Sequence, residues 1–179
     1  MRLRRAQGET TFPARAQLVL AANPCPCAKP AGDAGCECSS IVRRRYQNRL
    51  SGPLMDRVDL QVLLPPVRSG TLLDTIVGES SEVVAKRVLD ARAAAIARWR
   101  DLGRSNASVP SSVLRRPPFR LSRSVLDPLT RQVDQGRLSA RGFDRVVRVA
   151  WTIADADGRD RPDQGDIGEA IDLRTRREA

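Results

Sequence analysis

Hydrophobic and polar positions follow a strand-like pattern in the first part of the chain. Residues 17–22 form a short, nearly continuous apolar run that Asn23 and Pro24 close. Residues 58–64 alternate between apolar and polar before they merge into a second apolar run, which Pro65 ends. Short apolar runs that stop at turn residues are typical of buried strands in a parallel sheet. The pattern therefore predicts two sheet strands in this part of the chain.

From residue 81 onwards the pattern changes to that of helices. Apolar residues recur at steps of three and four positions from about residue 81 to residue 100, and similar stripes mark helices around residues 125–133, 140–157 and 163–173. Such a stripe gives a helix one face that packs against a core. Ser139 precedes the stripe at 140–157 and can cap that helix. A partial α/β core is therefore expected to precede an all-α domain.

Residues 67–80 show little periodicity and are predicted to be a linker. They contain two glycines and end at a Ser-Ser-Glu signal for a helix start. The predicted division is a first domain over residues 1–66, this linker, and a helical domain over residues 81–179. Within the first domain, Ser39 and Ser40 can cap a short helix over residues 41–50. That helix would carry Arg43, Arg44, Arg45 and Arg49.

The chain of 179 residues is strongly basic. It has 31 lysines and arginines against 21 acidic residues, which gives a formal net charge of +10. Basic surfaces bind polyanions because they release counterions from phosphate groups, so DNA is a candidate partner. However, all basic residues except Lys29 and Lys86 are arginines, a bias that a GC-rich genome produces without any function. Solvated helix faces therefore explain the charge equally well.

Several enzyme classes are excluded by residues that the sequence lacks. Histidine is absent, which rules out Ser-His-Asp or Cys-His catalysis and histidine-ligated metals. No segment matches the phosphate-binding loop called Walker A, because Lys29 and Lys86 both follow alanine. No apolar run ends in the Asp-Glu pair of a Walker B segment. We therefore expect no ATP hydrolysis by this chain alone.

The sequence favours a soluble, cytoplasmic protein. No uninterrupted apolar stretch approaches the ~20 residues that a transmembrane helix needs. The basic N-terminus is not followed at once by the apolar segment of a secretory signal. No membrane contact is expected.

All four cysteines lie within fourteen residues, as the two Cys-x-Cys pairs Cys25, Cys27 and Cys36, Cys38. Because thiols stay reduced inside cells, such a cluster favours a shared soft metal ion over disulfides, and zinc is the first candidate. A closed four-thiolate site would hold a loop together and leave no open position for a substrate. Structural zinc sites usually have the wider Cys-x2-Cys spacing, so free or redox-active thiols and disulfides remain alternatives.

Two polar residues stand at the ends of the predicted strands. Asn23 follows the first strand, at the edge where ligands bind in open α/β sheets, although an asparagine before Pro24 is also a common turn residue. Arg57 precedes the second strand. Taken alone, Arg57 would be expected to form a salt bridge with Asp56 or Asp59.

Several blocks of the sequence resemble, in order, motifs of the ComM-type, magnesium-chelatase-like AAA+ ATPases. The blocks span residues 12–174 and read FPARAQLVLAANPCPC, CECSS, RYQNRLSGPLMDRVDL, RLSARGFDRVVRVAWTIADADG and RPDQGDIGEAIDLR. In the family these motifs form the C-terminal part of the ATPase core and the helical lid after it. The resemblance therefore implies an α/β fragment, a partial AAA+ core with a few strands, followed by an all-α helical lid. The family pattern has glycine where this chain has Ala28.

The resemblance also implies roles for single residues. Asn23 matches sensor 1, which orients the attacking water at the γ-phosphate, and Arg57 matches the arginine finger that reaches the nucleotide of a neighbouring subunit. Arg141 matches sensor 2, with Arg148 as the second choice. ATP with Mg²⁺ would be bound only together with the missing core half or a neighbouring subunit, in a homo- or hetero-oligomeric ring.

Three functions remain open on this basis. The resemblance implies the C-terminal part of a DNA-processing motor, such as one that drives branch migration. A different class is a zinc-stapled helical adaptor that binds nucleic acid or protein without ATPase activity. The third is an inactive, partly unfolded product, because the two predicted strands would lack their sheet neighbours.

Overall fold

The computed structural model describes residues 2–6, 8–13, 17–29, 35–65, 67 and 78–175. The chain forms two compact units, residues 1–49 and residues 50–179. None of the helices in the described ranges combines the length and the apolar character that a bilayer crossing requires. The linker predicted at residues 67–80 lies largely outside the described residues.

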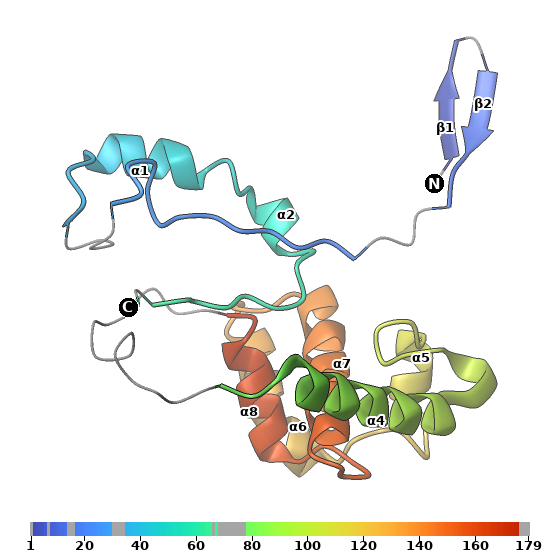
Figure 1. Cartoon of the computed structure of the whole chain (residues 1–179). Coiled ribbons are helices and arrows are strands. Elements are labelled where there is room, and N and C mark those ends of the chain that lie inside the picture. The colour runs from blue at the N-terminus through green and yellow to red at the C-terminus, as the bar shows by residue number, and fades with distance from the viewer. Residues whose placement is uncertain are drawn as a thin grey trace. The chain divides into compact units, whose positions relative to one another are not determined.

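In its described residues, the first unit contains the hairpin of β1 and β2 and the helix α1 (Figure 1). Strands β1 (Arg2–Arg5) and β2 (Gly8–Thr11) pair antiparallel, and Glu9 on β2 forms ion pairs with Arg2 and Arg4 on β1. Helix α1 (Ser40–Gln47) begins after Ser39, whose hydroxyl accepts a hydrogen bond from the Val42 backbone N–H. The predicted helix near residues 41–50 is therefore confirmed, with its cap.

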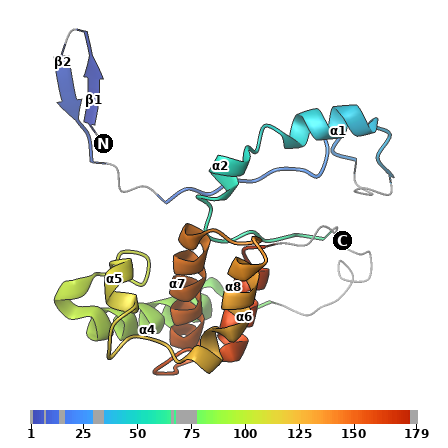
Figure 2. The ribbon, with the colours of Figure 1, turned by 180° about the vertical axis from the view of Figure 1, so that it is seen from behind.

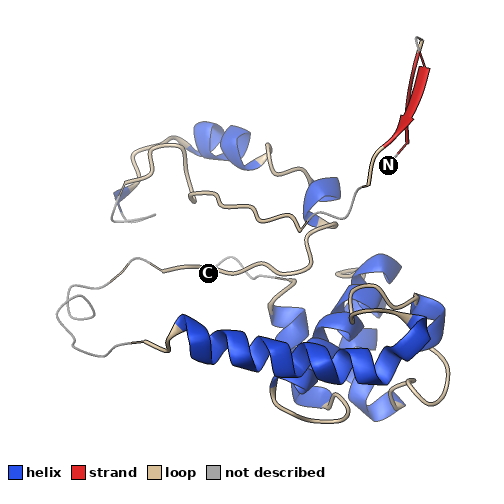
Figure 3. Cartoon of the chain, turned by 45° about the vertical axis from the view of Figure 1, so that its right-hand side comes forward, coloured by secondary structure: helices blue, strands red, loops and turns tan. Residues whose placement is uncertain are grey.

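The second unit is mostly helical, as the secondary-structure colours of Figure 3 show. Helices α7 and α8 pack together, α6 contacts both, and α4 contacts α7 (Figures 1 and 2). Serine hydroxyls cap α4, α6 and α7, and an aspartate capping box starts α8. The elements among its described residues are α2 (Gly52–Met55), α4 (Ser81–Trp99), the 3₁₀ helix η2 (Arg100–Leu102), α5 (Ser111–Leu114), α6 (Arg123–Asp134), α7 (Ala140–Ala156) and α8 (Gln164–Asp172).

Aromatic rings form the centre of the helical core. Trp99 packs edge-on against Trp151 with ring centroids 5.4 Å apart, and it lies 4.7 Å from Phe119. Leu129, Val146 and Ile167 are fully buried around these rings. The four helices predicted from residue 81 onwards are confirmed by α4, α6, α7 and α8. Helix α5 was not predicted, because its four residues are too few to show a period.

The two strands predicted at residues 17–22 and 58–64 are not formed. Neither segment belongs to a ladder in the described part of the chain, and the side chains of Val19 and Leu64 are 81% and 83% exposed. A strand is stable only when neighbouring strands pair its backbone groups and cover its apolar face. The broader expectation, a small sheet followed by a mostly helical part, is confirmed.

Candidate functional site

The four cysteine side chains converge on one point in the first unit. The sulfur atoms of Cys25, Cys27, Cys36 and Cys38 all lie within 4.8 Å of one another. Cys25 is buried, the other three are half-buried, and all four are free thiols. Four sulfurs arranged tetrahedrally at ~2.3 Å from a zinc ion would be ~3.8 Å apart. The Cys27 and Cys36 sulfurs match this spacing at 3.8 Å, whereas the Cys25 and Cys27 sulfurs lie closer together, at 2.9 Å. The set of four thiol donors fits a metal site.

Two local contacts shape this cluster. Ala28 follows the first Cys-x-Cys pair with φ of +50°, and its backbone N–H donates to the Cys25 carbonyl at 3.3 Å. A left-handed conformation costs alanine ~1–2 kcal/mol and glycine much less. Lys29 and Glu37 form an exposed ion pair of 2.5 Å that joins the two pairs of cysteines. The alanine in place of glycine is thus tolerated, with local strain.

The thiols differ in acidity. The pKa of Cys27 is lowered to about 6, because the Cys25 thiol donates a hydrogen bond to its thiolate and a backbone hydrogen bond at Lys29 adds to this. The same hydrogen bond raises the pKa of Cys25, and burial raises the pKa of Cys38. Since the thiolate is the form that binds metal ions, Cys27 is the thiol best prepared to bind one.

Asn23 lies in the first unit, two residues before Cys25. Its side chain is exposed and makes no hydrogen bond within the described ranges. Arg57, Arg141 and Arg148 lie in the second unit.

Arg57 lies in a turn that directly follows α2. Its side chain is exposed and donates a hydrogen bond of 2.7 Å to the Pro53 carbonyl. The expected salt bridge with Asp56 or Asp59 is wrong, because both carboxylates pair with arginines of the helical part instead. Asp56 pairs with Arg141 and Arg174, and Asp59 pairs with Arg145.

Arg174, just after α8, holds the backbone on both sides of Arg57. Its guanidinium donates to the carbonyl oxygens of Asp56 at 2.9 Å and Val58 at 2.8 Å, and its side chain is only 6% exposed. Gly142 makes room for it, since a Cβ there would lie 3.3 Å from Arg174 Nε. A backbone hydrogen bond of 2.6 Å from Gln61 to the Leu173 carbonyl extends the contact. The turn that carries Arg57 is thus fixed to the end of α8.

Arg141 stands in the first turn of α7 and contacts the same turn. It is 60% exposed and donates to the Asp56 carboxylate at 3.0 Å, which also accepts a hydrogen bond from the Ser139 hydroxyl at 3.3 Å. The Arg141 hydrogen bond is the main cause that holds the pKa of Asp56 below its usual value. Two of the candidate residues are therefore close to Asp56. Arg57 follows Asp56 in the sequence, and Arg141 forms an ion pair with its carboxylate.

Arg148, the second choice for sensor 2, is engaged elsewhere. Its guanidinium donates to the Val109 carbonyl at 2.9 Å and to the Ser111 hydroxyl at 3.0 Å. It thereby joins α7 to the segment that leads into α5. Its position is half-buried, in contrast to the exposed Arg141.

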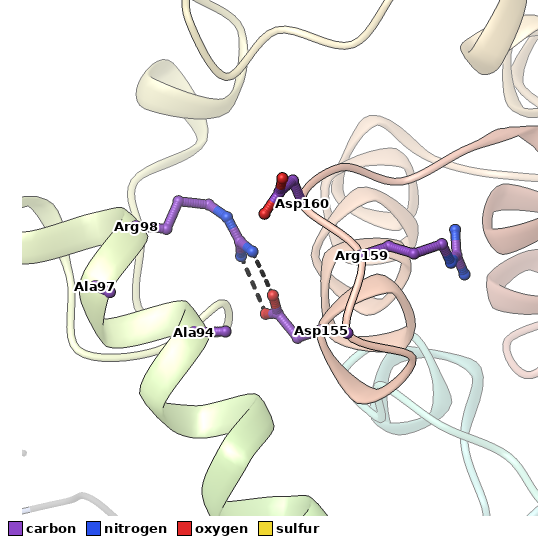
Figure 4. A pocket seen from close by; sticks show the side chains of 7 residues that line it. Ala94, Ala97, Arg98, Asp155, Arg159 and Asp160 are labelled. Atoms are coloured by element: carbon purple, nitrogen blue, oxygen red, sulfur yellow. Dashed lines mark hydrogen bonds and ion pairs between the residues drawn. The ribbon is translucent and has the colours of Figure 1, made fainter.

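A buried polar network that the sequence analysis missed lies beside a pocket of about 420 Å³ (Figure 4). Arg98 on α4 forms a two-point ion pair with Asp155 on α7, and its guanidinium stacks 4.4 Å from the Trp151 ring. Asn106 donates to Asp155 at 2.8 Å and accepts from the Trp99 indole at 2.7 Å. Arg98, Asp155, Asn106 and the Trp99 indole are hydrogen-bonded within this network, which holds α4 against α7.

Comparison with known proteins agrees with the motif order. The family model for magnesium chelatase, subunit ChlI, matches residues 1–72, and the model for the C-terminal domain of this subunit matches residues 78–174. An uncharacterized protein of Mycobacterium tuberculosis is 48% identical over 175 residues, which cover 97% of this chain and 34% of that protein.

Two further relatives come from other bacteria. The uncharacterized protein YifB of Escherichia coli is 37% identical over 173 residues, covering 96% of this chain and 33% of that protein. Competence protein ComM of Haemophilus influenzae is 35% identical over 171 residues, covering 95% of this chain and 33% of that protein. The chain spans about a third of the length of the curated relatives that it matches. The chain therefore belongs to the magnesium chelatase subunit ChlI family, as a ComM-type, magnesium-chelatase-like member.

Proposed function

We propose that this chain supplies the sensor and finger residues of the ATP sites in a ComM-type AAA+ ring that processes DNA. Asn23 acts as sensor 1, Arg57 as the arginine finger and Arg141 as sensor 2. Residues 1–66 belong to the ATPase core and residues 81–179 to the lid. The family membership and the relative named Competence protein ComM support this proposal.

The observation that supports the proposal most is how Arg57 is held: its side chain is exposed, while hydrogen bonds fix the backbone on both sides of it. An arginine finger must be exposed to reach a neighbouring subunit, yet its backbone must be fixed so that the guanidinium arrives in the right place. Arg57 is exposed, and Arg174 holds the carbonyl groups of the residues before and after it. Phosphoryl transfer depends mostly on such positioning and on charge neutralisation.

Arg141 is better placed than Arg148 for a sensor 2 role. It is more than half exposed, and its carboxylate partner Asp56 is itself partly exposed. A phosphate group could therefore replace Asp56 as the partner of Arg141 at small cost. Arg148 would first have to give up its hydrogen bonds to the buried Val109 and the half-buried Ser111.

The four cysteines serve a structural role in this proposal. When bound, zinc would link the four thiolates and leave no coordination position open for a reaction. The cysteine loop follows Asn23 directly and leads directly into α1. Such a staple would fix the chain between sensor 1 and α1.

A chimera tests the proposal. The matching third of the M. tuberculosis relative is replaced by this chain, so that the remainder of that relative supplies the nucleotide pocket. We expect hydrolysis by the chimera at ~1 s⁻¹ or faster and negligible turnover by this chain alone. Substitution of Asn23 or Arg141 by alanine should lower kcat, whereas Arg116→Ala, at an exposed arginine of the helical unit, should not. A chimera that assembles and binds ATP without hydrolysing it would contradict the proposal.

A further inference from the structure

Helix α1 and the turn after it carry four arginines and no acidic residue. They are Arg43, Arg44, Arg45 and Arg49. Between Cys38 and Met55 the sequence contains no aspartate or glutamate. Arg44, Arg45 and Arg49 are exposed, and Arg43 is half-buried. We refer to these four side chains as the α1 arginines.

The α1 arginines differ from many arginines of the helical unit in having no carboxylate partner among the described residues. None of the four forms an ion pair with any residue that the structure describes. The two other described acidic residues of the first unit, Glu9 and Glu37, are already paired. In the helical unit many arginines pair with aspartates: Arg98, Arg115, Arg131, Arg141, Arg145, Arg159 and Arg174. A compositional bias towards arginine explains neither this concentration nor its lack of counter-charges.

The arrangement of the arginines indicates the shape of the partner. Successive residues of a helix point about 100° apart, so Arg43, Arg44 and Arg45 spread around the helix instead of forming one stripe. A flat partner surface would meet only one side of such a helix. The major groove of a duplex is wide enough for a helix, and it presents phosphates along both of its edges.

A zinc ion bound by the four cysteines would anchor the base of the helix. Ser39, which caps α1, follows Cys38 of the cysteine cluster directly. A rigid anchor reduces the conformational entropy that is lost when exposed side chains become ordered on binding.

We propose that the α1 arginines form a binding surface for the phosphate backbone of a nucleic acid duplex, with α1 lying in its major groove. This inference rests on the proposed role in DNA processing and assigns the contact to one helix. It does not depend on ATP hydrolysis. The ATPase chimera and the binding experiment below therefore fail or succeed separately.

The test is a salt titration with the full 179-residue chain, loaded with zinc, and a fluorescent 20-base-pair DNA duplex. Each phosphate contact contributes about −0.9 to the slope of log affinity against log salt. The variant with Arg43, Arg44, Arg45 and Arg49 changed to glutamine should lose about 3.6 units of slope and bind ~10³-fold more weakly near 0.1 M salt. The corresponding lysine variant, which keeps the charge, should retain most of the slope.

A matched variant controls for net charge. It changes Arg104, Arg120, Arg123 and Arg137 to glutamine, four exposed arginines of the helical unit that form no ion pair with a described residue. The control variant should keep the duplex affinity within a few-fold of the unaltered chain. An equal loss in both glutamine variants would overturn the proposal, because the binding would then follow overall charge.

Two further ligands decide the class of partner. A single strand of the same sequence should bind more weakly and with a smaller slope, about −0.7 per phosphate contact. Equal affinity for the single strand would overturn the groove arrangement.

A competition experiment separates DNA from acidic proteins as the partner. Polyglutamate of matched charge should compete poorly. If it displaces the duplex as well as unlabelled duplex does, the surface recognises an acidic protein and the proposal is wrong.

Discussion

Arg174 shows how one buried side chain can position an exposed one. Its guanidinium donates hydrogen bonds to the carbonyl groups of the residues on either side of Arg57 and to the Asp56 carboxylate. Because the side chain is buried, these contacts are shielded from water and are stronger than those of a surface pair. The absence of a side chain at Gly142 is what allows this approach.

Arg174→Met should therefore destabilise the chain strongly. The substitution leaves two carbonyl groups without their side-chain donor and removes one of the three donors of the Asp56 carboxylate, so we expect a loss of about 3 kcal/mol in the free energy of unfolding of the helical unit. Urea denaturation followed by tryptophan fluorescence measures it. Arg137→Met, at an exposed arginine, serves as the control and should change stability by less than about 0.5 kcal/mol. Equal effects of the two substitutions would show that Arg174 does not hold the turn.

Ala28 offers the opposite kind of substitution, one that should stabilise. A φ of +50° is energetically unfavourable for alanine, whereas glycine adopts it readily because it has no Cβ. Relief of ~1 kcal/mol in the folded loop corresponds to about fivefold tighter zinc binding by Ala28→Gly. Competition with a chromophoric chelator measures the affinity, and Ala22→Gly, where φ is not positive, is the control. Weaker binding by Ala28→Gly would contradict the role assigned to this turn.

At the scale of elements, the helices were predictable and the strands were not. The three- and four-residue spacing located α4, α6 and α7, and serine caps were expected for α4 and α7. Helix α7 buries its stripe in the core, whereas α4 buries only Ala95 and Trp99 at its C-terminal end. An apolar run becomes a strand only when other strands pair with it. The pattern of residues 17–22 does not show whether such strands are present, so it could not predict a strand reliably.

Local spacing likewise decided which parts of the site were predictable. The cysteine cluster was expected from its spacing and is assembled in the structure. The contact between Arg174 and Val58 was not expected, since it joins residues 116 positions apart, a separation at which local pattern carries no information.

The contact between the Arg57 turn and α7 should be sensitive to acid. Arg141, burial and Arg174 act on Asp56, and the net effect is a pKa below the ordinary value of 3.8. A carboxyl whose pKa is lower in the folded state stabilises folding above its unfolded pKa and loses this effect as the pH falls through the folded value. Asp56→Asn should thus lower the free energy of unfolding at pH 7. It should also make stability fall less steeply as the pH drops from about 4 to 2. Urea titrations of both proteins across this range test it, and parallel pH profiles would count against it.

Zinc should act on the first unit alone. Removal of the metal frees the Cys38 end of α1, so we expect faster amide hydrogen exchange in Ser40–Gln47 and unchanged exchange in Ala140–Ala156. Cys36→Ser should reproduce the effect and lower the zinc content from one ion per chain. A purified chain that takes up no zinc would refute the assignment of the cysteines.

At the scale of the whole molecule, the chain exposes apolar side chains in the two segments whose pattern predicts strands. Leu18, Val19, Leu63 and Leu64 are each more than 60% exposed. The chain also spans only about a third of the relatives that it matches. Both facts agree with the proposal that its sensor and finger residues work together with a nucleotide pocket supplied by other residues.

The most direct test of that proposal is to mix two inactive rings. One chimera carries Arg57→Ala, which should reduce kcat by ~10³-fold or more. The other keeps Arg57 but has alanine in place of the Walker A lysine, which the family pattern places in the part taken from the M. tuberculosis relative. Because an arginine finger acts on the neighbouring subunit, mixed rings contain interfaces with an intact pocket and an intact finger. We predict that mixing restores measurable ATPase activity, and mixed rings that assemble yet remain inactive would contradict the assignment of Arg57.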